Sequence, residues 1–404
     1  MRPFSSVGRA ICSGWLPLLI ILLSAVLFLC ACGKAAEPFP LPAPVTPAAA
    51  EADPAPAAVT PAPLPPVEID GVLFSAETPR LVLTGLNTDK SQIEQLLPLF
   101  PNLAALDLRG TSVTQEEAMA LAARYPQISM VWDVNLFGRV FSSDAKEIDL
   151  SGTEMEDSSE VEASLKYFTG LEKVVMSDCG FSNEYMDELN RRYDGILFVW
   201  TVRFSVYSLR TDATMFCASD VPRLGNVAPE LSSQELDPIK YCTEMEALDL
   251  GHMAYKDISF LSSMTKMKYL ILVQGKFSDI SPIANMPDLE YLELFNNNRI
   301  IDLTPLLSCK NLKHLNIGYC YFVEWEPLKQ MPWLARLWMP HVEISDDELV
   351  MLQAALPDTL IYAPLTDAMG STGGGWREDP SYYEMRDIMG MPYLPGGTGM
   401  GLGW

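Results

Sequence analysis

The side chains best suited to chemistry in this 404-residue chain are its cysteines and histidines. Five cysteines lie outside the N-terminal leader, an odd number with no Cys-x-x-Cys pair: Cys179, Cys217, Cys242, Cys309 and Cys320. The histidines are His252, His314 and His341, and none has a second ligand at metal-binding spacing. This spacing predicts neither a zinc framework nor a catalytic histidine.

Motifs for nucleotide or acyl chemistry are also missing from the sequence. No Gly-x-Ser-x-Gly, P-loop or Gly-x-Gly-x-x-Gly motif falls in a strand–turn–helix context. Carboxylates are abundant enough to include a glycosidase-type pair, but no spacing singles one out. We therefore predict no catalytic residues, no metal and no cofactor, and hence a protein that is not an enzyme.

The elements that must position these residues form a tandem repeat. The pattern L-x-x-L-x-L, with Met or Ile at some positions, recurs in steps of 22, 22, 23 and 22 residues, starting at Met245, Met267, Leu289, Leu312 and Leu334. Between the units runs a second motif of the type Asp-Ile-Ser-Pro-Ile, whose proline favours a 3₁₀ or irregular path. Self-similarity at this period is typical of a solenoid.

These units resemble those of bacterial leucine-rich repeat proteins of the internalin type. The resemblance implies an α/β leucine-rich repeat solenoid, with parallel strands on the concave face and helices or 3₁₀ turns on the convex face. In such units the ninth position turns inward and bonds the backbone, which predicts that role for Asn297, Cys320 and Cys179. The disulfide state of Cys217, Cys242 and Cys309 stays open.

The sequence of the N-terminal half predicts a degenerate, duplicated version of the repeat. Leu103, Tyr125 and Trp132 have matches 68 residues later, at Leu171, Tyr193 and Trp200. Thr114 with Glu117 forms a capping box that predicts a helix. Residues 203–240 break the rhythm and are expected to be an insertion or joint.

The first 32 residues are typical of an export signal. A basic start precedes a long apolar run that ends in LCACGK, which resembles a lipobox with Leu29 at −3, Ala31 at −1 and Cys32 as the acylated residue. The alternative is an uncleaved transmembrane anchor. With Cys32 lipidated, the protein is expected on the outer face of the bacterial cell membrane, bound through its lipid only.

Composition divides the rest of the chain. Residues 35–66 hold eleven prolines and eleven alanines, which predicts an extended, disordered stalk. The predicted regions are a lipoprotein signal peptide (1–32), a Pro/Ala-rich linker (33–66), a degenerate duplicated repeat region with helices (67–240), a regular 22-residue repeat array (241–365) and a Gly/aromatic-rich C-terminal tail or cap (366–404). The formal net charge of −24 disfavours nucleic acid as a partner.

Outward-facing strand positions are the candidate binding residues. They carry more aromatic and apolar side chains than a solvated sheet face should, which is typical of a binding surface. They are Tyr269, Ile271, Val273, Tyr291, Glu293, Phe295, His314, Asn316, Arg336 and Trp338. Two alternatives stay open: an open ligand face, or a face covered by the tail, where PSYYEMRDIM predicts a short helix beginning at Pro380.

Three functions fit these sequence features. The first is a surface protein that binds a protein partner through its concave face. The second is an envelope lipoprotein that binds or processes glycan or peptidoglycan, since tyrosine and tryptophan also stack on sugars. The third is a structural component that assembles with copies of itself.

Overall fold

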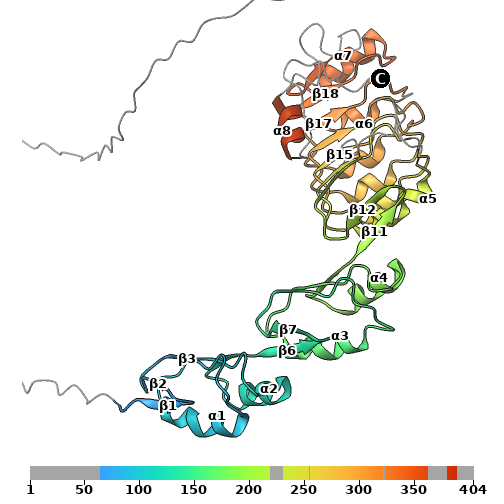
Figure 1. The fold of residues 1–404 in the computed structure, drawn as a ribbon. Coiled ribbons are helices and arrows are strands. Elements are labelled where there is room, and N and C mark those ends of the chain that lie inside the picture. Colours follow the sequence, from blue (N-terminus) through green and yellow to red (C-terminus); the bar gives the residue numbers. More distant parts are fainter. Residues whose placement is uncertain (1–63, 219–230, 254, 322–323, 363–379, 389–404) are drawn as a thin grey trace, which may run out of the picture. The chain divides into compact units, whose positions relative to one another are not determined.

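A computed structural model of the protein describes residues 64–218, 231–253, 255–321, 324–362 and 380–388 (Figure 1). The predicted signal peptide, Cys32 and nearly all of the linker lie outside the described residues. So do residues 366–379 and 389–404 of the tail. The assignments made for these segments therefore stay predictions.

The repeats form the predicted α/β leucine-rich repeat solenoid. Seven short parallel strands pair in chain order to make the main sheet. The strands are β13 (Met215–Cys217), β14 (Ala247–Asp249), β15 (Tyr269–Ile271), β16 (Tyr291–Glu293), β17 (His314–Asn316), β18 (Arg336–Trp338) and β19 (Leu360–Tyr362). Because side chains alternate along a strand, the central leucine of each strand from β14 to β18 points into the solenoid and is fully buried.

The segments between these strands are short turns, as the Asp-Ile-Ser-Pro-Ile motif predicts. The aspartate accepts a hydrogen bond from the backbone N–H two residues on, as from Ser281 to Asp279 at 2.8 Å. That bond starts a single 3₁₀ turn. These turns are η5 (Ser259–Ser263), η6 (Ser281–Asn285) and η7 (Thr304–Ser308), whereas the last two return segments carry the α-helices α6 (Glu326–Lys329) and α7 (Asp346–Ala355) instead.

Each coil bends at its eighth and ninth positions. The eighth residue of every regular unit has a left-handed backbone conformation. Its φ lies between +54° and +65° at His252, Gln274, Asn296, Tyr319 and His341. The ninth turns inward, as predicted: Asn297 Nδ2 donates to the carbonyls of Leu272 and Leu294 at 2.7 and 2.8 Å. His252 and His341 are thus bend residues.

The N-terminal region repeats a longer module, and α2 starts at the predicted capping box of Thr114 and Glu117. Each module joins an antiparallel hairpin to a small parallel sheet. The strands are β1 (Val67–Ile69), β2 (Val72–Phe74), β3 (Arg80–Val82), β4 (Ala105–Asp107), β5 (Ser129–Val131), β6 (Asp133–Leu136), β7 (Arg139–Ser142), β8 (Glu147–Asp149), β9 (Lys173–Val175) and β10 (Leu197–Val199). The helices are α1 (Lys90–Leu96), η1 (Leu97–Leu99), α2 (Gln115–Arg124), α3 (Ser159–Ser164), η2 (Leu165–Tyr167) and α4 (Asn183–Arg192).

The module begins a third time where the sequence predicts an interruption. Residues 203–240 contain most of the hairpin β11 (Thr201–Phe204) and β12 (Tyr207–Arg210), then β13, α5 (Ser233–Leu236) and η4 (Asp237–Tyr241). The three hairpin turns have positive φ at Asp70, Phe137 and Ser205, which lie 67 and 68 residues apart. The third turn lacks the glycine that follows in the first two, so its sequence conceals the repeat. In its described part, this range continues the module instead of breaking it.

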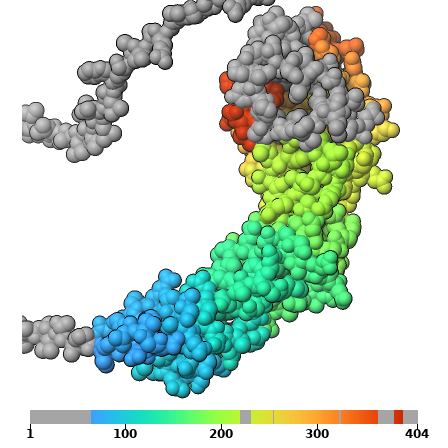
Figure 2. Space-filling view, in the orientation of Figure 1, coloured from blue at the N-terminus to red at the C-terminus, as the bar shows by residue number. Residues whose placement is uncertain are grey.

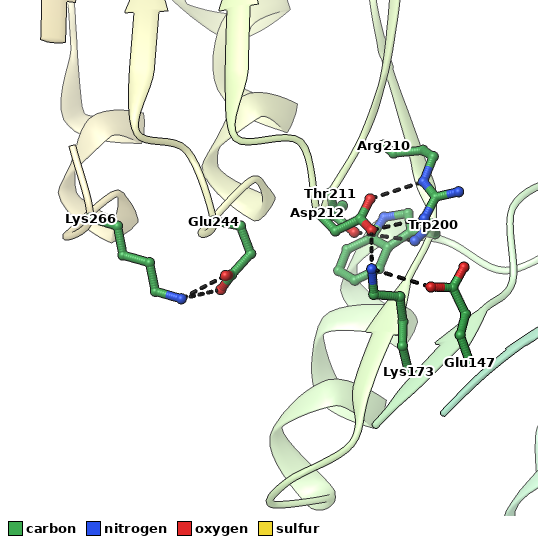
Figure 3. A network of polar contacts seen from close by, with 8 residues as sticks. All are labelled: Glu147, Lys173, Trp200, Arg210, Thr211, Asp212, Glu244 and Lys266. Atoms are coloured by element: carbon green, nitrogen blue, oxygen red, sulfur yellow. Dashed lines mark hydrogen bonds and ion pairs between the residues drawn. The ribbon is translucent and has the colours of Figure 1, made fainter. Parts of the chain in front are cut away.

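Each later hairpin is closed at its base by a backbone pair of a tryptophan and a hydroxyl residue, which continues the hairpin ladder. The backbone N–H of Trp200 donates to Thr211 Oγ1 at 3.2 Å, and the backbone N–H of Thr211 donates to the Trp200 carbonyl at 2.9 Å (Figure 3). Trp132 and Ser143 make the same two contacts one module earlier, at 3.0 and 2.9 Å. The predicted match of Trp132 with Trp200 therefore marks a repeated junction.

An ion-pair network lies at the second of these junctions. Asp212 is within 2.8 Å of both Lys173 and Arg210, and Lys173 also lies 3.5 Å from Glu147 (Figure 3). Burial acts to raise the pKa of Asp212, but the hydrogen bonds from Arg210 and Lys173 outweigh it and lower that pKa below its usual value. The network therefore stabilises the fold only while Asp212 is ionised.

Replacing Asp212 by asparagine is expected to lower the free energy of unfolding at pH 7 by about 1–2 kcal/mol. Because the pKa is lowered in the folded state, this stability is present above the unfolded pKa of about 4 and is lost as the pH falls further. The stabilities of D212N and the parent, measured by urea unfolding, should thus converge only as the pH falls through the lowered folded pKa of Asp212. E244Q, which breaks the more exposed Glu244–Lys266 pair, should change stability by less than about 0.5 kcal/mol. Equal losses in both variants at pH 7 would contradict the assigned role of Asp212.

Candidate functional site

Strand pairing brings the predicted binding residues together on one face of the main sheet. Here "concave face" means the outward side chains of β14 to β18 and of the residues directly after them. One registered row holds Tyr269, Tyr291, His314 and Arg336, and the next holds Ile271, Glu293, Asn316 and Trp338. Val273 and Phe295 follow two residues after the ends of β15 and β16.

Of the two alternatives, an open ligand face does not hold for most of these residues. Six of the ten predicted residues are buried: Ile271, Val273, Tyr291, Glu293, Asn316 and Trp338. The other four, Tyr269, Phe295, His314 and Arg336, are half-buried. The physical reason is that bulky apolar side chains on a sheet face are covered wherever the chain can supply a cover. Their role in binding stays a prediction.

Helix α8 (Pro380–Ile388) supplies part of that cover. It starts at Pro380, as predicted, and its Met385 has no exposed surface. Met385 belongs to one apolar cluster with Ile271, Tyr291 and Trp338, against which Tyr382 also packs. Figures 1 and 2 show α8 (red) against this side of the repeat array. The tail-covered alternative therefore holds for α8.

Charge also links α8 to the face. Burial raises the pKa of Tyr269, and the negative charges of Glu290 and of Glu384 on α8 raise it further. The pKa of Lys313 is raised by its hydrogen bond to Glu290 and, more weakly, by Tyr269 and Glu384. An acidic residue of α8 thus lies near a basic residue at the edge of the face.

Some polar groups inside the covered face have hydrogen-bond partners and others do not. Tyr291 Oη donates to Glu293 Oε1 at 2.5 Å, and Asn316 Oδ1 accepts from the N–H of Gly318 at 3.0 Å. Asn316 Nδ2 and Trp338 Nε1 are buried, and neither finds an acceptor in the described part of the chain. A buried donor without an acceptor costs about 1–3 kcal/mol, so this pair is a marked departure from ordinary packing.

Trp338 is also the centre of an aromatic group. Its ring stacks on Tyr362 with centroids 5.7 Å apart and an angle of 14°, and on His314 at 6.0 Å and 29°. Tyr291 lies 6.4 Å away in a tilted arrangement. A flat ring system of this kind can stack on an aromatic side chain or on a sugar.

The cysteines take structural positions. Cys179 and Cys320 donate to the carbonyls of Leu150 and Leu294 at 3.3 and 3.1 Å, as the ninth-position rule predicts. Burial raises the pKa of Cys320 and of Cys242 to about 12, so both are protonated thiols at neutral pH. No disulfide joins the five cysteines of the described chain.

The described residues also bear on metal binding and on crossing a membrane. Within them, no group of three or more His, Cys, Asp or Glu side chains is placed to hold a metal ion. None of the helices described there combines the length and the apolar character needed to cross a membrane.

Several residues of the covered face were not predicted from the sequence. Cys217 on β13 and Tyr362 on β19 extend it at both ends, and Cys217 Sγ contacts Asp249 Oδ2 at 3.5 Å. The β19 segment LIY has the alternating pattern of a strand, and this pattern could have predicted that Tyr362 belongs to the face. The contribution of Met385 had only a weak signal, the spacing of Tyr382 and Met385 on one side of a short helix.

Comparisons with known proteins find leucine-rich repeat structures. An internalin (inlF) from Listeria monocytogenes is 18% identical with a TM-score of 0.29, covering 72% of this chain and 76% of that one. An internalin C2 from the same species is 16% identical with a TM-score of 0.29, and the match covers 72% of this chain and 84% of that one. A leucine-rich repeat protein of Leptospira interrogans is 16% identical with a TM-score of 0.29, and the match covers 66% of this chain and 74% of that one. At these values the fold assignment rests on this chain's own strand register.

Sequence comparisons add no relative. A comparison with protein-family models finds no match, and neither does a comparison with curated proteins.

Proposed function

We propose that this chain is an exported, lipid-anchored leucine-rich repeat protein that binds a protein partner through its concave face. The observation that carries the proposal is the seating of α8. A helix far along the chain from β15 and β16 has its Met385 completely buried against the concave face. A surface that takes up a short helix of its own chain has the shape and chemistry to take up a helix of another.

The physical properties of the face support this role. The strands are held by neighbouring coils on both sides, so the outward side chains are presented by a rigid sheet. Tyrosine, tryptophan and arginine, the residue types that most often anchor interfaces, lie together at Tyr291, Trp338 and Arg336. Binding then needs no covalent step, only contact and desolvation.

A peptide tests the face directly. The probe is a fluorescent peptide of residues 377–391, and the protein is the full chain after the leader, residues 33–404, carrying Met385→Glu so that its own α8 leaves the face. We expect saturable binding to this variant. A chain with Ile388→Glu should bind at least about tenfold more weakly, because residue 388 is exposed and the resident helix stays in place. No binding to the Met385→Glu chain would overturn the proposal.

The lipid anchor has its own test. Replacing Cys32 by serine should abolish incorporation of radiolabelled fatty acid and release the protein from the membrane fraction, because each buried CH₂ contributes about 0.8 kcal/mol to anchoring. Cys30→Ser is the matched control and should change neither result. Continued acylation of the Cys32→Ser chain would refute the assignment.

A glycan-binding function is the alternative, and the stack of His314, Trp338 and Tyr362 favours it. Soluble peptidoglycan fragments added to the Met385→Glu chain give the discriminating result. Binding of the fragments without binding of the peptide would select this alternative over a protein partner.

A further inference from the structure

We infer that the partner helix of the concave face carries a carboxylate directly before its buried apolar anchor, and that this carboxylate pairs with Lys313 and fixes where along the face the helix sits. The inference rests on the proposed function and specifies the partner's chemistry. It follows from a row of charges along one edge of the face and from the place where that row ends.

Charged side chains line the edge of the face where the strands begin. They are the second residues of the L-x-x-L-x-L units: Glu246, Lys268, Glu290 and Lys313, followed by Ala335. Backbone hydrogen bonds of 2.7–2.9 Å join each of these residues to the next, so they lie one above another, coil by coil. We call this row the edge ladder. Acid and base alternate along it, which brings opposite charges side by side.

The edge ladder has no further acid after Lys313. Lys268 lies between Glu246 and Glu290, and its Nζ is 2.8 Å from Glu246 Oε2. Lys313 Nζ is 2.6 Å from Glu290 Oε2, but the next residue along the ladder is Ala335, which has no charge. An ammonium group has three N–H donors, and 55% of the Lys313 side chain is exposed. Lys313 can therefore bind a second carboxylate that comes from outside the ladder.

Helix α8 brings a carboxylate to this place. Met385 is buried in the apolar cluster of the face, against which Tyr269 packs. Glu384 directly precedes Met385 and is exposed. Burial raises the pKa of Tyr269, the hydrogen bond to Glu290 raises the pKa of Lys313, and the charge of Glu384 adds to both increases. An acid of α8 thus lies beside the lysine that the next coil leaves without a second acidic neighbour.

The same contacts set the requirements for a partner helix. An apolar side chain must fill the place of Met385, and a carboxylate must directly precede it to reach Lys313. The apolar contact supplies most of the affinity, because an exposed ion pair contributes little. The ion pair supplies the register and the choice between helices, since a basic residue in the place of Glu384 would put two cations together.

Reversing the charge on both sides of the pair tests the inference. The protein is again the full chain after the leader with Met385→Glu, and the probe is the peptide of residues 377–391, native or with Glu384→Lys. Lys313→Glu in the chain should weaken binding of the native peptide about tenfold, and Glu384→Lys in the peptide should weaken binding to the chain with Lys313 by about the same factor. With both changes, the affinity should return to within about threefold of the native pair.

Three controls separate a specific pair from a general change in charge. Lys268→Glu reverses the same charge two coils earlier on the edge ladder, so it should leave the ratio of the two peptides' affinities unchanged. Lys313→Gln carries no charge and should bring that ratio close to one. The preference should also shrink in about 0.5 M salt, because the Lys313 side chain is exposed to solvent.

A second readout uses the chain with Met385 intact and no peptide. Glu384→Lys should increase amide exchange in α8, and adding Lys313→Glu should reverse the increase. The inference is overturned if the double reversal does not restore peptide binding, if exchange stays high in the doubly reversed chain, or if Lys268→Glu shifts the peptide ratio as much as Lys313→Glu. In each of these cases the native peptide still binds the Met385→Glu chain, whereas failure of the proposed function would abolish that binding.

Discussion

Replacing Asn297 by alanine is expected to lower the free energy of unfolding by about 2–4 kcal/mol. Asn297 is fully buried, and its Nδ2 donates to the carbonyls of Leu272 and Leu294 at 2.7 and 2.8 Å. These bonds join two successive coils of the solenoid. Alanine would remove this donor from the Leu272 carbonyl and would leave the Leu294 carbonyl with the Cys320 thiol alone, at the bend where the chain turns away from the sheet.

Asn297→Cys is the matched control, because Cys320 occupies the equivalent position one repeat later and donates to the carbonyl of Leu294. A cysteine has one donor where the amide has two, but it also removes Asn297 Oδ1, which is buried without a partner in the described chain. We expect a loss about half that of alanine. Urea unfolding followed by circular dichroism gives both values, and an alanine variant as stable as the parent would show that these bonds are dispensable.

Replacing Met385 by glutamate is expected to detach α8 and lower the free energy of unfolding by about 1.5–3 kcal/mol, the contribution of a buried methionine. A carboxylate at this position would be buried among Ile271, Tyr291 and Trp338, beside the buried Glu293. The helix should leave rather than bury a carboxylate among apolar side chains. Amide exchange should then rise on β15 to β18 and stay unchanged on β8 and β9.

The control places the same charge elsewhere on the same helix. Ile388 is 43% exposed, so Ile388→Glu should leave both stability and exchange close to those of the parent. Should the two variants give equal exchange on β15 to β18, α8 would not be seated as described, and the peptide experiments would have no basis.

The repeat units were predictable from sequence because their determinants are local. Each L-x-x-L-x-L unit specifies a strand by alternation. In three return segments the aspartate accepts from the backbone N–H two residues later and so starts the turn. The capping box of Thr114 and Glu117 likewise acts within one helical turn. These patterns need no knowledge of distant residues, and the array they build extends coil by coil.

The third module could not be recognised from the sequence, because its hairpin turn lacks the glycine that marks the first two. Its hairpin turns at Ser205 and Val206, where the first two modules have glycine, as at Gly71 and Gly138. The backbone at Ser205 still adopts φ of +52°, held by the pairing of β11 with β12. The pairing, and not the turn residues, specifies this hairpin.

By itself, the sequence determined that this protein is a leucine-rich repeat solenoid, where its strands lie and which residues face outward from them. Only the tertiary structure decided that the outward face is covered. Met385 packs in one apolar cluster with Ile271 and Trp338, residues far from it in the chain, and this packing has no period that a sequence pattern could reveal. Asn316 and Trp338 are buried with side-chain donors that find no acceptor in the described chain, whereas the same side chains on an open face would bond to water.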